Sequence, residues 1–183
     1  PDLPDAVTAI STSIPLAPLD VQATDGTLIA QVRITWTQSE GATYYELYRS
    51  EPGSPDREYV HTRDGQYNFT DDNNGDGTVL EYALKACSEV GCSDFSNFDT
   101  GYADMPILNA IDNPEQDGTF TVSWVGANTA SSHTLQEQWN GGTWESIYTG
   151  ELSSQALTGK EVGVWCYRVN AYNAIQLDSP WTM

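Results

Sequence analysis

The chain carries the same short pattern twice. Apolar residues alternating with polar ones lead to Trp36 in Val-Arg-Ile-Thr-Trp, and to Trp124, 88 positions later (124 − 36), in Phe-Thr-Val-Ser-Trp. Nine positions beyond each tryptophan stands a ring side chain, followed two positions later by leucine. The ring is Tyr45 in one case and His133 in the other. Because the spacing of these core-type residues is kept, the chain is restricted to two copies of one small folding unit.

A third block extends the repeat. Tyr-Ala-Leu-Lys-Ala begins at Tyr82, and Tyr-Arg-Val-Asn-Ala begins at Tyr167, 85 positions later (167 − 82), so the second copy is shorter in between. A length of 183 residues accommodates two small domains, each near the size at which one core holds itself together. We therefore expect a linker or tail at 1–16, a first repeat at 17–103 and a second repeat at 104–183.

The local pattern is that of short β-strands. Thr, Val, Tyr and Trp alternate with polar residues at a spacing of two, and turn residues recur every 8–12 positions, which is typical of an antiparallel sandwich. Asn140-Gly141 between two such runs is a strong hairpin signal. No helical periodicity is found. We expect seven strands per repeat, near 18–24, 30–37, 43–50, 57–62, 67–71, 79–87 and 92–100, and near 106–112, 118–125, 132–139, 143–149, 153–157, 162–172 and 179–183.

The strand pattern resembles the fibronectin type III family. In that family the core tryptophan lies on the second strand and an inward tyrosine begins the sixth, as Trp36 and Tyr82 do, whereas an immunoglobulin domain has its tryptophan on the third strand. The run Ala-Cys-Ser-Glu-Val-Gly-Cys-Ser is similar to the bacterial secreted type. The resemblance covers 17–183 and implies an all-β fold of two tandem seven-stranded antiparallel β-sandwiches, immunoglobulin-like in architecture. In the second repeat the chain ends at Met183, where the family's last strand should just have begun, so we expect that strand to be short or truncated.

Three cysteines indicate the compartment. Cys87 and Cys92 are separated by four residues, a length that suits a β-hairpin loop closed by a disulfide. A zinc site is disfavoured, because it needs about four ligands and no second Cys or His pair lies nearby. A disulfide implies an oxidising environment. Cys166 is expected to be a free, partly covered thiol, with an intermolecular bridge as the alternative.

The charge excludes several partners. With 26 acidic and 7 basic residues the formal net charge is −19, so the chain repels nucleic acid and anionic membrane surfaces. No apolar run is long enough for membrane insertion. These features, with the disulfide, predict a secreted or cell-surface location.

One loop resembles a metal site. Asp72, Asn74 and Asp76, followed by Gly77, match the first half of an EF-hand calcium loop, in which alternating oxygen ligands converge on one ion. The match fails at the twelfth position, where Ala83 replaces the bidentate glutamate. The alternative is an ordinary turn, since Asn, Asp and Gly also favour turns for conformational reasons. Calcium is the one cofactor that the sequence suggests.

Exposed aromatic residues form a second candidate. Trp139 and Trp144 flank the Asn140–Gly142 turn, and Trp181 lies near the end. Flat indole rings stack on sugar rings, and neighbouring acidic and amide groups bond sugar hydroxyls. The hypothesis is a glycan platform at Trp139 and Trp144, and the alternative is that these rings cover a sheet edge or a domain junction.

Catalysis has little support in the sequence. The histidines, His61 and His133, lie in different repeats, and His133 takes the place of a core tyrosine. No nucleophile-elbow, zinc-protease or phosphate-loop motif occurs. We therefore expect a non-enzymatic spacer and presentation module of a secreted or surface protein, partnered by other domains of its parent, with adhesion to a cell-surface protein as a further role. The alternative is an accessory polysaccharide-binding or calcium-dependent module attached to a secreted hydrolase.

Overall fold

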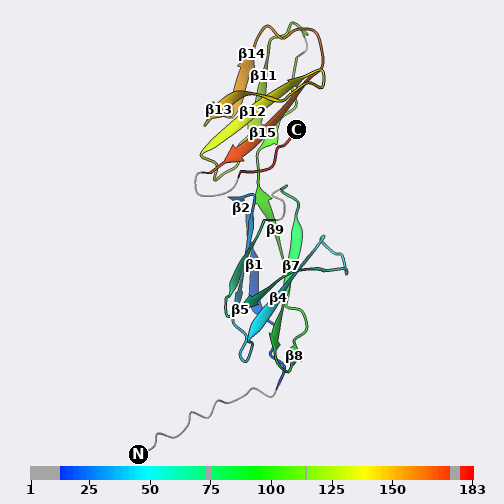
Figure 1. Cartoon of the computed structure of the whole chain (residues 1–183), viewed down its shortest axis with the longest axis vertical. Helices are drawn as coiled ribbons and strands as arrows, with labels where there is room; N and C mark the ends of the chain where they lie inside the picture. Colours follow the sequence, from blue (N-terminus) through cyan, green and yellow to red (C-terminus); the bar gives the residue numbers. More distant parts are fainter. Residues whose placement is uncertain (1–12, 73–75, 114, 174–177) are drawn as a thin grey trace, which may run out of the picture. The chain divides into compact units, whose positions relative to one another are not determined.

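The computed structural model describes residues 13–72, 76–113, 115–173 and 178–183. Within these ranges every regular element is a β-strand (Figure 1). This agrees with the alternating pattern of the sequence, in which residues of high strand propensity recur at period two. The asparagine of the calcium hypothesis, Asn74, lies outside the described residues.

Strands of the first repeat form two sheets. The smaller has the order β1-β3-β6, and the larger has the order β2-β9-β7-β4-β5, with β8 paired to β7. Most neighbours are antiparallel, but β2 and β9 are parallel. The strands are β1 (Leu19–Ala23), β2 (Asp25–Ile29), β3 (Val32–Thr37), β4 (Tyr44–Ser50), β5 (Glu58–Asp64), β6 (Asn68–Asp71), β7 (Leu80–Ser88), β8 (Gly91–Cys92) and β9 (Asp99–Asp104).

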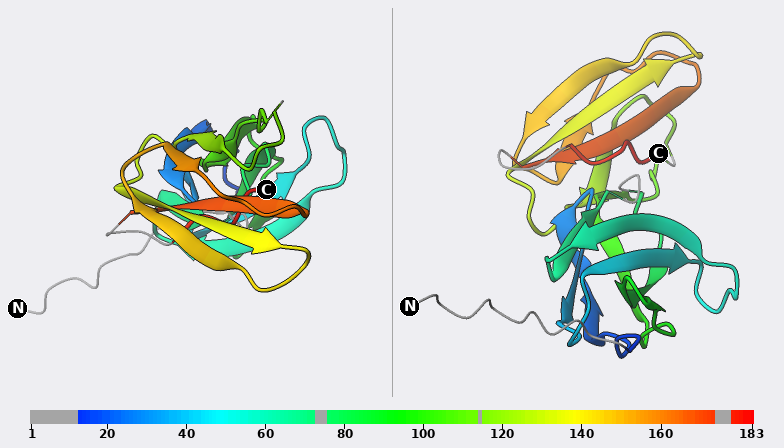
Figure 2. Two further views of the ribbon diagram at one scale, coloured as in Figure 1. Left: turned by 90° about the horizontal axis from the view of Figure 1, so that it is seen from above. Right: turned by 60° about the horizontal axis from the view of Figure 1, so that its bottom comes forward.

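Strands of the second repeat also form two sheets, with the orders β10-β11-β14 and β13-β12-β15. Figure 2 gives two further views of the second of these sheets, in which β12 (yellow) lies between β13 (orange-yellow) and β15 (orange-red). All the pairings in these two sheets are antiparallel. The strands are β10 (Ile107–Leu108), β11 (Phe120–Val125), β12 (Ser132–Trp139), β13 (Glu145–Gly150), β14 (Ser154–Leu157) and β15 (Trp165–Tyr172).

The predicted inward residues form the core. Trp36 meets Tyr45 with ring centroids 5.4 Å apart at 59°, and Trp124 meets His133 at 6.0 Å and the same angle. Burying one large apolar side chain stabilises a fold by roughly 1.5–3 kcal/mol, so these residues carry much of its stability. Other buried members are Val32, Ile34, Leu47, Tyr82 and Leu84 in the first repeat, and Val122, Leu135, Tyr167 and Val169 in the second.

Residue contacts divide the chain into two compact units that interleave in sequence. The first comprises Pro1–Gln22, Ile34–Phe69 and Glu81–Asp99, and the second comprises Ala23–Arg33, Thr70–Leu80 and Thr100–Met183. The second unit contains two buried apolar clusters, one around Val122 and Leu135 and one of Ile29 with small alanines. The predicted boundaries at 16/17 and 103/104 follow the sequence repeat instead, and they stay a prediction.

Four strand predictions need correction, and the described residues form nine strands in the first repeat and six in the second instead of seven in each. The strand expected at 106–112 is only two residues long, Ile107–Leu108. No strand was expected between those at 18–24 and 30–37, but β2 (Asp25–Ile29) forms there, with a positive φ of +56° at Gly26. The strand expected at 92–100 is split into β8 and β9. Between them the hydroxyls of Ser93 and Ser96 accept hydrogen bonds from backbone N–H groups of β7, which interrupts the regular backbone pairing. The strand expected at 179–183 is reduced to one antiparallel bridge between Thr182 and Val169.

The cysteine prediction is confirmed at the hairpin and wrong in one detail. Cys87 and Cys92 form a disulfide between paired positions of β7 and β8. Cys166 is free, as expected, but it is exposed rather than partly covered. It alternates with inward Tyr167 on β15, so its side chain leaves the core face of the sheet.

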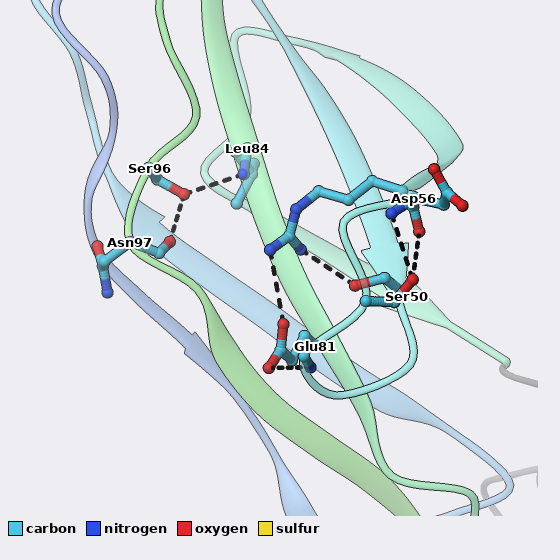
Figure 3. Close-up of polar contacts among 9 residues, drawn as sticks. Ser50, Asp56, Glu81, Leu84, Ser96 and Asn97 are labelled. Atoms are coloured by element: carbon cyan, nitrogen blue, oxygen red, sulfur yellow. Dashed lines mark hydrogen bonds and ion pairs between the residues drawn. The ribbon is translucent and has the colours of Figure 1, made fainter.

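A buried carboxylate fixes the loop between β4 and β5. Glu81 accepts a hydrogen bond of 3.0 Å from the Gly53 amide and lies 3.5 Å from the Arg57 guanidinium. Arg57 also donates to the Ser50 hydroxyl, at 3.2 Å (Figure 3). Because both charged side chains are largely withdrawn from water, removal of either one would leave the other as an uncompensated buried charge.

Candidate functional site

The hairpin between β12 and β13 has the backbone that its sequence predicts. Asn140 and Gly141 both have positive φ, +48° and +76°, as a type I′ turn requires, and the Gly142 amide donates to the Trp139 carbonyl at 2.8 Å. Asn140 also ties the turn to the start of β15. The backbone N–H of Asn140 donates to the Val164 carbonyl at 2.8 Å. The side-chain oxygen of Asn140 accepts from the backbone N–H of Val164 at 2.9 Å. The turn is therefore held from two sides.

Trp139, the last residue of β12, stacks on Trp165, the first residue of β15. The two are register partners, with ring centroids 6.1 Å apart and 28° between the planes. The Trp165 indole donates to the Glu161 carbonyl at 3.0 Å. Gly163 packs so closely that a Cβ there would lie 2.2 Å from the Trp139 indole nitrogen. Trp139 is nevertheless 43% exposed, so a fixed indole faces solvent.

Two carboxylates share this end of the sheet. Glu137 stands two residues before Trp139 on the same face, and Glu145 on β13 is its register partner. Lys160 forms an ion pair with Glu137 and places its ammonium 4.3 Å from the centroid of the Trp165 ring. The lining of this open cleft, which has a volume of about 260 Å³, comprises Glu137, Trp139, Gly142, Thr143, Glu145 and Trp165.

A second cleft of about 300 Å³ adjoins the same tryptophan. Trp165 lines it together with Asn113, Gln116 and Lys160, from the loops that lead into β11 and β15. Trp165 thus lines both clefts, the first with two carboxylates and the second with two amides, Lys160 and Glu161. Together the clefts offer aromatic faces and hydrogen-bonding groups.

Trp144 lies in a different environment from Trp139. The Arg168 guanidinium is 4.3 Å from the Trp144 ring centroid and 4.5 Å from that of Trp181, so the cation is held between two indoles. Gln136 accepts from the same guanidinium at 2.9 and 2.7 Å. Arg168 alternates with the core residues of β15, and this cluster therefore occupies the outer face of the sheet. The predicted pair Trp139 and Trp144 contact different groups on opposite faces.

The loop of the calcium hypothesis is described only at its ends. Asp72 and Asp76 are exposed, and Asn74 falls outside the described residues. The Asp76 carboxylate accepts from the Thr78 amide at 2.9 Å, the local bond of an Asx turn. Calcium binding here stays a prediction.

Two buried titratable groups lie near the core of the second repeat. Burial lowers the pKa of His133, and neither ring nitrogen has a hydrogen-bond partner among the residues that the structure describes. Burial first, and then the nearby Glu137 carboxylate, raises the pKa of the Tyr167 phenol well above its usual range. Both groups are therefore neutral near pH 7, as the packing interpretation of His133 requires.

Sequence reasoning missed Trp165 and Glu137 as site residues. The sequence did contain a signal for both. Glu137 is two positions before Trp139, and Trp165 is two positions before the predicted inward Tyr167, so each lies on the same face of its strand as that residue. What the sequence lacked was the register that brings Trp165 opposite Trp139.

Similarities to three bacterial proteins each cover about half of the chain. No protein-family model matches the chain. Over 94 residues, 51% of this chain, it is 35% identical to an amylopullulanase of Thermoanaerobacterium thermosulfurigenes and 34% identical to one of Thermoanaerobacterium saccharolyticum. The chain spans 5% and 7% of these relatives. A solved Fn3-like protein from Clostridium thermocellum is 25% identical, over 50% of this chain and 95% of its own, with a TM-score of 0.45.

The fibronectin type III fold predicted from the sequence is confirmed. Each repeat has a buried tryptophan on the middle strand of a three-stranded sheet, β3 or β11, and an inward tyrosine on a strand of its other sheet, β7 or β15. The all-β sandwich class and the Cys87–Cys92 disulfide are likewise established. Within the described part of the chain, no helical segment has the length and apolarity that a membrane crossing needs.

Proposed function

We propose that this chain is a non-catalytic module of a longer, secreted polysaccharide-degrading enzyme, in which it spaces and presents neighbouring domains. The observation that carries the proposal is the match to two amylopullulanases, in which the matched 94 residues form a small fraction of a long chain. A short segment shared with large enzymes, in a fold of repeated sandwiches, is what an accessory domain provides. The partners are then other domains of the same parent protein.

The chemistry of the chain supports an extracellular setting for this role. The Cys87–Cys92 disulfide suits an oxidising compartment, and the net charge of −19 favours solubility over association with anionic surfaces. Buried aromatic residues in the core stabilise each sandwich. Adhesion to a cell-surface protein stays a prediction from the sequence.

The test separates a spacer from a catalyst and from a recognition module. The purified chain is first assayed for reducing-sugar release from amylose and pullulan, with none expected. In the parent enzyme, residues 17–183 are then deleted, or replaced by an unrelated pair of β-sandwich domains. If the chain acts as a spacer, its deletion should lower the activity of the parent enzyme on polymeric substrate, and the replacement domains should restore that activity. Hydrolysis by the isolated chain, or full activity after deletion, would refute the proposal.

A further inference from the structure

We infer that the cleft between β12, β13 and β15 binds a neutral polysaccharide, with one pyranose ring stacked on the exposed indole of Trp139. This inference goes beyond the spacer role and does not depend on it, because the cleft belongs to the chain itself. It also moves the predicted glycan site: Trp165, and not Trp144, is the second aromatic member.

The aromatic part of the cleft is built before any ligand arrives. Trp139 is stacked on Trp165, and Gly163 packs at its indole nitrogen, where a larger residue would collide. The Trp165 indole is in turn fixed by its bond to the Glu161 carbonyl. One face of a pyranose ring presents C–H groups, which are attracted to the electron-rich face of an indole. Fixing the rings beforehand reduces the entropy that binding would otherwise cost.

The polar part of the cleft matches sugar hydroxyls. Glu145 is exposed beside the indole and Thr143 adds a hydroxyl, so both lie where the rim of a stacked ring would meet them. Glu137 is mostly withdrawn from water and held by Lys160, which keeps its carboxylate in place as an acceptor. A carboxylate accepts strong, charge-assisted hydrogen bonds from hydroxyl groups.

Charge selects a neutral glycan over an anionic one. Two carboxylates line the cleft, and the one ammonium nearby is already engaged by Glu137 and the Trp165 ring. The chain carries a net charge of −19, which repels sulfated or uronic-acid polymers. An uncharged ring with several hydroxyls meets none of these penalties.

The second cleft provides a path for a longer chain. It shares Trp165 and Lys160 with the surroundings of the first and adds the amides of Asn113 and Gln116. Each cleft is small, about 260 and 300 Å³, which is at or below the lower limit of small-ligand pockets. A single sugar ring can occupy only one of them, whereas a longer chain can contact both. We therefore expect a chain of two or more sugar rings to bind more tightly than a monosaccharide.

The experiment is calorimetric titration of the full chain with glucose, maltoheptaose, cellohexaose and pullulan. Saturable binding of at least one oligomer is expected, with weaker binding of glucose. Trp139→Ala and Trp165→Ala should each weaken it about tenfold or more, as the loss of an aromatic hot spot does. Trp144→Ala, on the outer face, is the matched control and should bind as the wild type does.

A second readout separates lost contacts from lost folding. Each variant is checked by its melting curve and by the indole N–H resonances, which should shift for Trp139 and Trp165 on sugar addition but not for Trp124 in the core. Trp139→Phe keeps a ring and should retain part of the affinity. Absence of binding to the whole panel, or loss with Trp144→Ala while Trp139→Ala binds normally, would overturn the inference. Neither result would bear on the spacer role, which the domain-replacement experiment decides.

Discussion

The Cys87–Cys92 disulfide allows the sharpest test of the folding argument. The bond joins register partners on β7 and β8 across a sequence separation of 5. On the chain-entropy account, closing so short a loop stabilises the folded state by about 2 kcal/mol. For a domain of this size that amounts to roughly 8–16 °C in Tm. Reduction should therefore weaken the first repeat markedly without unfolding it.

The assay uses two perturbations that differ in one respect. Reduction of the wild type breaks the bond and leaves both sulfur atoms, whereas Cys87→Ala with Cys92→Ala also removes a fully buried thiol. The double variant should be destabilised more, because it adds a packing loss to the loss of the cross-link. Cys166→Ser, at an exposed thiol, is the matched control and should leave stability unchanged.

A local probe is needed because two domains seldom unfold as one two-state system. The first repeat contains a single tryptophan, Trp36, whose indole N–H resonance reports on that repeat alone. Its loss is followed during chemical unfolding with and without reductant. A midpoint that reduction leaves unchanged, or an equal shift for the Trp124 resonance, would refute the reasoning.

Three further predictions follow from individual side chains. Because burial lowers the pKa of His133, the folded state resists its protonation; stability should be constant above about pH 6.5 and fall as the pH drops below it, and His133→Tyr should abolish this part of the pH dependence in thermal melts. Glu81→Gln should cost about 1–3 kcal/mol, measured by urea unfolding, because it leaves the Arg57 guanidinium with a weakened partner. Calcium binding at Asp72 and Asp76 predicts that millimolar Ca²⁺ raises the Tm and that EDTA reverses the rise; a melting curve indifferent to both would dispose of the calcium hypothesis.

The core was predictable because it depends on local alternation. Period two assigned Val32, Ile34 and Trp36 to one face, and all three are buried. The same reasoning failed for β2, since Asp25-Gly26 is a turn signal by composition. Its pairing with β9 is parallel and joins residues far apart in sequence, such as Asp25 and Tyr102. Local pattern holds no information on such a pairing.

The candidate site was predictable only in part, for a related reason. Trp139 and Trp144 are close in sequence, and a hairpin was correctly expected between them. The face of the sheet on which each ring lies depends on the register of β12 and β13. That register shifts between Leu135 and Gln136, and β13 begins only at Glu145. A change of one residue in register moves a side chain to the other face of a sheet.

Comparison of the two repeats shows that the stacked tryptophan pair of the cleft has no counterpart in the first repeat. The core positions correspond, but Trp139 stands where the first repeat has Glu51 (139 − 88), and Trp165 stands where it has Leu80 (165 − 85). These equivalents would be register partners as well, because Ser50 already pairs with Glu81. Folding therefore does not require two stacked indoles at this place, since the first repeat forms the same strands without them. The fold can therefore form without the Trp139–Trp165 pair, which lies in a solvent-facing cleft with two carboxylates. Ligand binding explains the presence of this pair more simply than a contribution to stability does.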